Sequence, residues 1–210
     1  MDNTLNLILC GSFSPITYAH LRTFEQARDK LKAKGITVNR GIISPVNDDY
    51  GKKDLATANH RVEMIRLAIE DSDWLEVNTW EIDQPKFVLT YDALIEIKKL
   101  VDPNTQLALL CGADLLHSMT IPNVWSDEHI EGILRDFGIV VVARADCNII
   151  ALIESHPILK KYEHRIIVCD ENILRSVSST EVRNCIRNGT SAKYFTPQSV
   201  LDYIHENGLW

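Results

Sequence analysis

The chain has 210 residues, a formal net charge of −7 at pH 7 and a hydrophobic content of 45%. A chain of this length and composition can bury a sizeable core within one large domain. The negative charge argues against general nucleic-acid binding, which needs a basic surface, so an anionic substrate would require a locally positive pocket.

The cysteines and the N-terminus indicate the compartment. The five cysteines form no Cys-x-x-Cys pair, which predicts a reducing environment without a disulfide framework or a structural zinc site. The first residues, Met-Asp-Asn-Thr, carry neither a basic n-region nor an Arg-rich amphipathic leader. No apolar segment reaches membrane length. We therefore expect a soluble, intracellular protein with no membrane and no nucleic acid among its partners.

The N-terminal part of the chain contains a strand, a glycine turn and a helix start in succession. The apolar run 7–10 predicts a buried strand, Gly11 breaks it, and Pro15 fixes the backbone of the turn. Thr17 can then cap a helix that has His20 in its first turn. Free backbone N–H groups at a helix start bind anions, so this stretch is a candidate phosphate site. A buried strand with a tight turn and a surface histidine is the structural alternative.

The rest of the chain alternates between strand and helix patterns. After the first helix, the sequence predicts strands over 38–44, 75–79, 107–111, 139–143 and 165–169, and helices over 59–70, 90–100 and 196–208. In the last of these, Thr196 is the expected cap and Pro197 the first-turn proline. The alternation predicts an α/β fold with a doubly wound, mostly parallel sheet and helices on both faces. No linker interrupts it, so we expect a single domain over residues 1–210, helical from about residue 178.

Charged residues and glycines follow several of these strands. Lys52 and Lys53 lie in the polar loop after the second predicted strand, on the side where open α/β sheets bind ligands, although adjacent lysines are usually solvated surface charge. Gly112 and Asp114 follow another strand and suit a ligand hydroxyl or a helix cap equally well. Arg144 comes directly after the most strand-like run of the chain.

A second candidate anion site precedes the C-terminal helix. Ser178 and Glu181 fit a capping box, which would be a purely structural arrangement. That arrangement does not explain the two further hydroxyls of Ser179 and Thr180, followed by Arg183. Hydroxyls, helix N–H groups and a guanidinium suit phosphate, which arginine binds with two parallel hydrogen bonds. Because both candidate anion sites follow strands, we expect them at the same sheet edge.

Five motifs occur in order along the chain: G-S-F-S-P-I-T-Y-A-H-L-R, I-I-S-P-V-N-D-D-Y, L-L-C-G-A-D-L-L, P-N-V-W and S-S-T-E-V-R. The first and last resemble the phosphate-binding signatures of the nucleotidyltransferase superfamily. With the three middle motifs, the set resembles a nicotinamide/nicotinate mononucleotide adenylyltransferase of the eukaryotic type. The resemblance extends from about Leu7 to the C-terminal helix.

This resemblance implies a Rossmann-like fold and an enzyme that joins nicotinamide or nicotinate mononucleotide to the AMP part of ATP. The products would be NAD or deamido-NAD and pyrophosphate, with Mg²⁺ accompanying ATP and no metal site in the protein. The residues implied in ATP binding are Gly11, Ser12, Phe13, Thr17, His20, Lys52, Lys53, Ser179, Thr180 and Arg183. Those implied in mononucleotide or NAD binding are Gly11, Ser12, Lys52, Trp80, Phe87, Thr90, Gly112, Asp114, Val124, Trp125 and Arg144. His20 and Arg183 are the expected catalytic residues.

Such a reaction needs no covalent intermediate. The phosphate of the mononucleotide is already an anionic nucleophile, and pyrophosphate is a competent leaving group once neutralised, so positioning and charge stabilisation suffice. We expect His20 to be a cation or a hydrogen-bond donor to the α-phosphate in the transition state. It needs no general-base role, because the nucleophile has no proton that must leave.

Some positions depart from the pattern of the family. Phe87 stands where a tryptophan is common, so Trp80 or Trp125 could supply the ring stack, although a tryptophan is more often core filler. Arg175 stands where an asparagine is usual, which leaves the adenosine contacts there open. The chain also lacks the long basic insertion of nuclear members, which favours the cytoplasm over the nucleus.

Two alternative functions remain at this level. Another small-molecule nucleotidyltransferase, such as a cytidylyltransferase or a phosphopantetheine adenylyltransferase, would keep both phosphate motifs without needing the middle ones. A non-catalytic nucleotide-binding or chaperone-like protein could use the same fold, but it would not need His20, the lysine pair and Arg183 together. The expected partners are ATP and either mononucleotide, and the sequence leaves a homo-oligomer open.

Overall fold

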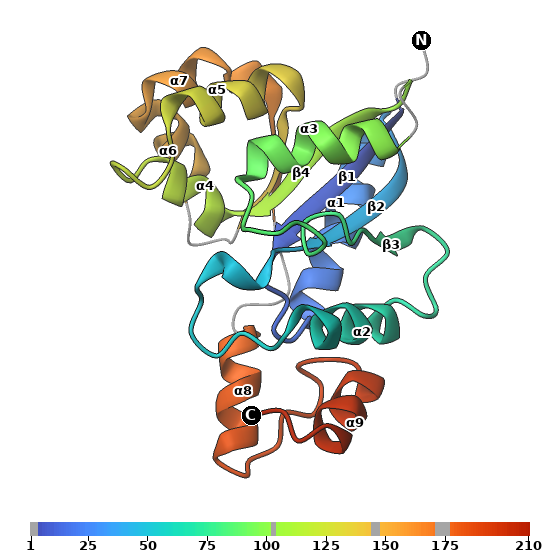
Figure 1. The fold of residues 1–210 in the computed structure, drawn as a ribbon. Helices are drawn as coiled ribbons and strands as arrows, with labels where there is room; N and C mark the ends of the chain where they lie inside the picture. Colours follow the sequence, from blue (N-terminus) through green and yellow to red (C-terminus); the bar gives the residue numbers. More distant parts are fainter. Residues whose placement is uncertain (1–3, 102–103, 144–147, 171–176) are drawn as a thin grey trace. The chain divides into compact units, whose positions relative to one another are not determined.

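The computed structural model describes residues 4–101, 104–143, 148–170 and 177–210 (Figure 1). Its strands are β1 (Thr4–Gly11), β2 (Thr37–Pro45), β3 (Leu75–Val77), β4 (Gln106–Gly112), β5 (Ile139–Ala143) and β6 (Ile166–Asp170). Its helices are α1 (Tyr18–Ala33), α2 (Ala58–Ala68), α3 (Thr90–Leu100), α4 (Ala113–Met119), α5 (Asp127–Asp136), α6 (Ile149–Ser155), α7 (Pro157–Lys161), α8 (Ser179–Arg187) and α9 (Gln198–Glu206). Two 3₁₀ turns, η1 (Asp48–Tyr50) and η2 (Glu163–Arg165), complete the described elements.

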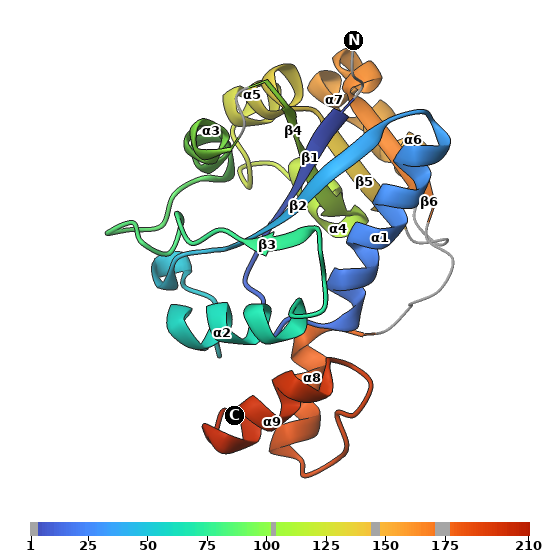
Figure 2. The same ribbon diagram turned by 90° about the vertical axis from the view of Figure 1, so that its right-hand side faces the viewer.

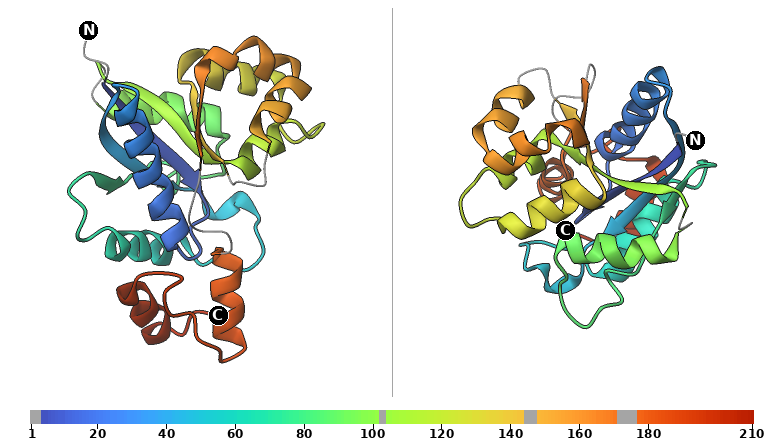
Figure 3. Two further views of the ribbon diagram at one scale, coloured as in Figure 1. Left: turned by 180° about the vertical axis from the view of Figure 1, so that it is seen from behind. Right: turned by 90° about the horizontal axis from the view of Figure 1, so that it is seen from above.

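The described strands form a six-stranded sheet in the order β3-β2-β1-β4-β5-β6 (Figure 2). The pairs β1–β4, β4–β5 and β5–β6 are parallel, with Leu7 opposite Ala108 and Leu109 opposite Ile139. Figures 1 and 3 show α3 on one face of β1 and β4, and α1 on the other. In this strand order the winding reverses between β1 and β4, as in doubly wound folds. The prediction of a doubly wound α/β fold is confirmed.

The contacts of the chain divide it into two compact units, each assembled from separate stretches of sequence. The first unit contains Met1–Leu9, Thr23–Gly41 and Leu89–Ile173. The second unit contains Cys10–Arg22, Ile42–Val88 and Leu174–Trp210. The second unit therefore holds the carboxyl ends of β1 and β2 together with β3, α2, α8 and α9. The expectation of a single domain over the whole chain stays a prediction.

Local sequence patterns explain the main elements of the first unit. All five residues of β5 are buried, as expected for a strand that is covered on both faces. Phe24, Ala27 and Leu31 form the apolar stripe of α1, and each is fully buried. Gly35 follows the helix with φ +74°, a backbone conformation that suits glycine.

The structure also contains α4 to α7, which the sequence pattern does not predict. Three of these helices have seven residues or fewer, too few for a helical hydrophobic period to repeat. The fourth, α5, carries a local signal, because the Ser126 side chain accepts a hydrogen bond from the backbone N–H of His129. The strand β3 is shorter than predicted, because the Asn78 side chain accepts from the backbone N–H of Trp80 and begins a turn.

The start of the C-terminal helix corrects a prediction. Thr196 is not the cap: α9 begins at Gln198, with Pro197 in the N-cap position and no side-chain cap bond. Thr196 is instead buried, and its hydroxyl donates to the carbonyl of Ile16 at 2.7 Å. The hydroxyl that would have capped the helix is used to attach it to the turn after β1.

Among the described residues, Cys10, Cys111, Cys169 and Cys185 take part in no disulfide. Cys147 lies outside the described residues. Within the same ranges, no helix combines the length and the apolar character needed to cross a membrane.

Candidate active site

The turn after β1 is built around Gly11 and Phe13. Phe13 is buried at φ +44°, and its ring lies so close to Gly11 that a Cβ there would be 3.2 Å from a ring carbon. The carbonyl of Gly11 accepts a hydrogen bond from the backbone N–H of Val46 at 2.9 Å. A side chain at Gly11 would therefore require the Phe13 ring to shift by a few tenths of an ångström, whereas the backbone bond to Val46 joins the ends of β1 and β2.

His20 lies in the first turn of α1, edge-on to the ring of Phe13 at 5.2 Å between centroids. The backbone N–H of Thr17 donates to His20 Nδ1 at 3.0 Å, and Thr17 Oγ1 lies 2.9 Å from the same nitrogen. Since an N–H can only donate, Nδ1 is an acceptor and the proton of the neutral ring lies on Nε2. Burial, and then the charge of Lys52, lower the pKa of His20 to about 4. Of the two states expected for His20, a cation or a neutral hydrogen-bond donor, this pKa favours the neutral donor in the free protein.

The loop between β2 and α2 brings a lysine to the same turn. Lys52 Nζ donates to Ser12 Oγ at 3.1 Å. Burial, and then the charge of Arg183, lower the pKa of Lys52. Lys53 is exposed and makes no comparable contact among the described residues. Ser12, His20, Lys52 and Arg183 thus form a cluster of donors in the second unit, which we call the anion site.

Arg183 enters the anion site from α8, which begins as the sequence predicts. Ser178 caps this helix by accepting from the backbone N–H of Glu181 at 3.1 Å. Arg183 is buried and donates from Nη1 to the carbonyl of Ser14 at 2.8 Å and from Nη2 to Thr180 Oγ1 at 3.2 Å. Its Nε is buried without a hydrogen-bond partner among the described residues.

The two candidate anion sites of the sequence are brought together by direct hydrogen bonds. Ser179 Oγ donates to the carbonyl of Pro15 at 2.7 Å, across 164 residues of sequence. Its hydroxyl proton is therefore engaged with the protein, whereas Thr180 is exposed. Thr17 is completely buried and does not face solvent. Its backbone N–H and its hydroxyl contact His20 Nδ1 and so orient the imidazole.

A buried arginine that the sequence analysis did not single out supports the anion site. Arg61 is fully buried on α2 and forms an ion pair with Asp48 at 2.7 Å. It also donates to three backbone carbonyls, those of Ser12 at 3.2 Å, Val46 at 2.7 Å and Ala56 at 2.9 Å. The signal in the sequence is its spacing: Arg61 lies four residues before Ile65, within the apolar stripe of α2.

Glu81 places a buried carboxyl at the ends of β1 and β2. Glu81 is 2% exposed, and it accepts hydrogen bonds from the hydroxyl of Ser44 and from the thiol of Cys10. Burial raises its pKa to about 7, although these bonds and the charge of Arg61 act in the opposite direction. The carboxyl thereby joins the ends of β1 and β2 to the segment that follows β3.

The segment after β3 carries Trp80 and Phe87, two of the three aromatic residues expected near the nicotinamide. Asn47 Nδ2 donates to the carbonyl of Gln84 at 2.7 Å and so fastens this segment to the end of β2. Phe87 pairs with Tyr50, the last residue of the I-I-S-P-V-N-D-D-Y motif, at 5.2 Å between ring centroids. Trp80 is half-buried, and its carbonyl accepts from the Gln84 side chain.

The remaining predicted residues that the structure describes belong to the first unit. Gly112 ends β4 and is the N-cap residue of α4, so Asp114 is not the cap and lies exposed in the first turn. Trp125 Nε1 donates to Ser118 Oγ at 2.9 Å. Val124 is 55% exposed, Thr90 is the first residue of α3, and Arg144 and Arg175 lie outside the described residues. That these residues and the anion site form one substrate site stays a prediction.

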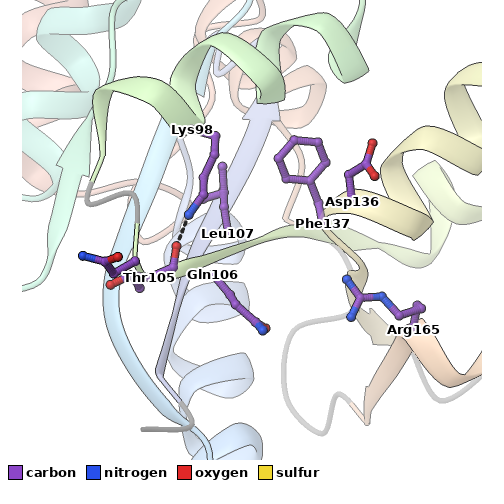
Figure 4. Close-up of a pocket in the computed structure, with 8 residues that line it drawn as sticks. Lys98, Thr105, Gln106, Leu107, Asp136, Phe137 and Arg165 are labelled. Atoms are coloured by element: carbon purple, nitrogen blue, oxygen red, sulfur yellow. Dashed lines mark hydrogen bonds between the residues drawn. The ribbon is translucent and has the colours of Figure 1, made fainter. Parts of the chain in front are cut away.

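A pocket of about 370 Å³ lies elsewhere in the first unit (Figure 4). Lys98, Asp136 and Arg165 line it, and Lys98 donates to the carbonyl of Thr105. It lies where β4 begins, whereas ligands of doubly wound folds bind where strands end. None of the predicted site residues lines it, so we assign it no part in the reaction.

Comparisons with known proteins agree with this geometry. The cytidylyltransferase-like family model matches residues 8–185, and nucleotidyltransferases of this kind typically use a divalent metal with ATP. A nicotinic acid mononucleotide adenylyltransferase of Plasmodium falciparum, solved in complex with NaAD, has the same fold, with a TM-score of 0.73 at 21% identity. The alignment covers 98% of this chain and 97% of that one.

Curated relatives place the chain more narrowly. A nicotinamide/nicotinic acid mononucleotide adenylyltransferase of Arabidopsis thaliana is 38% identical over 97% of this chain and 89% of its own length. Nicotinamide/nicotinic acid mononucleotide adenylyltransferase 1 of Bos taurus is 35% identical over 97% of this chain and 88% of its own length. The Schizosaccharomyces pombe enzyme of the same name, without the number, is 41% identical over 98% of this chain and 60% of its own length. With relatives at this identity along nearly its full length, the chain belongs to the nicotinamide/nicotinic acid mononucleotide adenylyltransferases.

Proposed function

We propose that the protein joins nicotinamide or nicotinate mononucleotide to the AMP part of ATP, giving NAD or deamido-NAD and pyrophosphate. The observation that carries this proposal is the convergence of Ser12, His20, Lys52 and Arg183 in the second unit, where the two phosphate motifs of the sequence are hydrogen-bonded together. Family membership supports the choice of substrates, because the relatives named above carry this activity in their names.

The reaction is a displacement at the α-phosphorus of ATP. A phosphate oxygen of the mononucleotide forms the new P–O bond, and the bond from the α-phosphorus to the bridging oxygen breaks. Pyrophosphate leaves with that electron pair, and no proton has to be removed from the nucleophile. The Nε2–H of His20 is the donor that we assign to a non-bridging α-phosphate oxygen, where negative charge accumulates in the transition state.

The leaving group requires positive charge at its oxygens. We assign Lys52 and Arg183 to the β- and γ-phosphates, with Lys53, Ser179, Thr180 and the start of α8 close to them in sequence. Mg²⁺ is proposed to arrive with ATP and to neutralise the phosphate charge. The described residues contain no group of three or more His, Cys, Asp and Glu side chains suited to hold a metal, and magnesium usually binds through substrate phosphates and water instead of a cage of side chains.

For the mononucleotide we propose the residues that the sequence motifs imply. Gly112 and Asp114 are proposed for the ribose, where an exposed carboxylate can accept from a hydroxyl. The aromatic and small residues proposed for the pyridine ring are Trp80, Phe87, Thr90, Val124 and Trp125, with Tyr50 added because its ring pairs with that of Phe87. We propose Arg144 for mononucleotide binding as well.

Turnover with ATP and nicotinamide mononucleotide tests the proposal. NAD formation, followed with a coupled dehydrogenase, and stoichiometric pyrophosphate release are the expected results. A cytidylyltransferase would require CTP, and a phosphopantetheine adenylyltransferase would act on phosphopantetheine. A non-catalytic protein would bind ATP without releasing pyrophosphate. Any of these three results would contradict the proposed reaction.

We further propose that the protein works in the cytoplasm, with neither a membrane nor nucleic acid among its partners. The net charge of −7 supports the absence of nucleic acid and anionic membranes among the partners, because it opposes binding to polyanions. A fluorescent fusion in the cell of origin tests the compartment. Light scattering after gel filtration measures whether it is a homo-oligomer.

A further inference from the structure

Asp54 adopts a backbone conformation that its residue type does not favour. Its φ is +63°, in the left-handed region where glycine is the usual residue and aspartate is tolerated at a cost. In the same conformation its carboxylate lies 2.9 Å from Arg187 Nη2. Its carbonyl accepts a hydrogen bond from Trp210 Nε1 at 3.1 Å. The conformation therefore aims the side chain of Asp54 at α8.

The two members of this ion pair lie beside the two cations of the anion site. Asp54 is two residues after Lys52, in the same loop. Arg187 is four residues after Arg183, one turn further along α8 and on the same side of the helix. The pair thus connects the loop that carries Lys52 to the helix that carries Arg183.

The charges of the pair also act on Arg183 directly. The charge of Arg187 opposes that of Arg183, whereas the charge of Asp54 favours it. Two arginines one helical turn apart repel each other. Asp54 offsets this repulsion through its ion pair with Arg187.

Stability alone does not account for this arrangement. The side chains of Arg187 and Asp54 are 37% and 29% exposed, and ion pairs with this access to solvent contribute little because water and salt screen them. The left-handed backbone of Asp54 costs free energy of a similar size. A glycine at this position would avoid that cost, so the carboxylate needs another explanation.

We propose that the Asp54–Arg187 ion pair is a positioning device that holds the lysine loop against α8, so that Lys52 and Arg183 reach the triphosphate together. The inference rests on the proposed function, because it takes the triphosphate of ATP as the ligand of the anion site. Asp54 and Arg187 act through Lys52 and Arg183 and are positioning residues, not catalytic ones.

The substitution Asp54→Asn tests the inference with little effect on the fold, because asparagine tolerates the left-handed region as well as aspartate does. If the pair positions the loop, the Kd for ATP and the Kd for inorganic pyrophosphate, measured by calorimetry, both rise about three- to tenfold. In turnover, KM for ATP rises in parallel while kcat changes little. If the Asp54 carboxylate only repelled anions, its removal would lower the Kd values of both ATP and pyrophosphate. An unchanged or lower Kd would overturn the inference.

A double-mutant cycle adds a second readout. Arg187→Gln alone should raise the Kd values for ATP and pyrophosphate to a similar extent. The double variant should bind both ligands no more weakly than either single variant, because each single substitution already breaks the ion pair. Additive effects would show that the two residues act independently and would contradict the inference. Asp49→Asn in the same loop and Arg66→Gln on α2 make the same charge changes at exposed positions, and should leave both Kd values unchanged.

These measurements separate the inference from the proposed function. A wild-type protein that forms no NAD from ATP and nicotinamide mononucleotide contradicts the function. The pyrophosphate Kd still tests the ion pair in that case, because it needs neither the adenosine nor the mononucleotide.

Discussion

At the residue scale, the imidazole of His20 shows how the protein selects a protonation state. The Thr17 N–H fixes Nδ1 as an acceptor, and burial with the nearby Lys52 holds the pKa of His20 near 4. The ring is therefore neutral at physiological pH and keeps one defined donor at Nε2. Its hydrogen bond to an α-phosphate oxygen strengthens when the transition state forms, because negative charge then accumulates on that oxygen.

His20→Ala removes this donor from the transition state. We expect kcat to fall by about 10²-fold or more, the usual loss for one preorganised donor, with little change in KM for nicotinamide mononucleotide. Steady-state kinetics measure both, with His205→Ala as a control for an exposed histidine of the second unit. A variant with nearly normal kcat would exclude the assignment.

Glu81 makes the stability of the protein depend on pH. Its pKa is about 7 in the fold, above the ordinary value of 4.5, so the native state binds more protons than the unfolded chain between these values. The free energy of unfolding therefore falls as pH rises through this window, by about 3 kcal/mol from this group. Glu81→Gln should remove that loss: relative to the wild type, its stability should rise between pH 5 and pH 8. Chemical denaturation at both pH values measures it, and a constant difference would contradict the prediction.

At the scale of elements, α8 brings a helix start and an arginine to the turn after β1. The bonds from Arg183 to Ser14 and Thr180, and from Ser179 to Pro15, hold this helix against the turn. Its cap at Ser178 is visible in the sequence, because a cap involves neighbours in the chain. Its attachment to β1 is not visible there, because the partners are 164 and 169 residues apart.

Arg183→Lys replaces the planar guanidinium with a single ammonium group. Lysine cannot reach Ser14, Thr180 and a phosphate oxygen in one fixed geometry. We expect kcat/KM for ATP to fall by at least about tenfold, as for the loss of one charged hydrogen bond. Arg66→Lys, an exposed arginine of α2, is the control and should retain full activity. If Arg183→Lys keeps both ATP affinity and turnover, the residue is only a buried structural cation.

At the scale of the whole molecule, the question is which mononucleotide the enzyme accepts. Nicotinamide and nicotinate share the ring and differ in a neutral amide against a carboxylate. A strict enzyme would need a group that repels one of them, or a buried polar group left unpaired by it. The ring-lining residues predicted from the sequence, Trp80, Phe87, Thr90 and Trp125, carry no charge.

We therefore expect both mononucleotides to be adenylylated, with kcat/KM values within about tenfold of each other, roughly 1.4 kcal/mol. Stacking is indifferent to the ring substituent, and the Thr90 hydroxyl can donate to an amide oxygen or to a carboxylate. Parallel steady-state assays on the two substrates measure the ratio. A preference above about a hundredfold would mean that another group discriminates between them.

The α/β class, most strand and helix positions, the two phosphate motifs and the cap of α8 could be predicted from the sequence, because each depends on residues within a few positions of one another. Which polar groups are buried together is visible only in the folded chain. The partners of Arg61, of the Glu81 carboxyl and of Asp54 come from distant segments, so no local pattern identifies them. Thr196 shows how a distant partner can override a local signal. The sequence predicts it as a helix cap, but its hydroxyl donates to the carbonyl of Ile16 instead. A buried carbonyl left without a donor costs more than a missing cap bond at a solvated helix end.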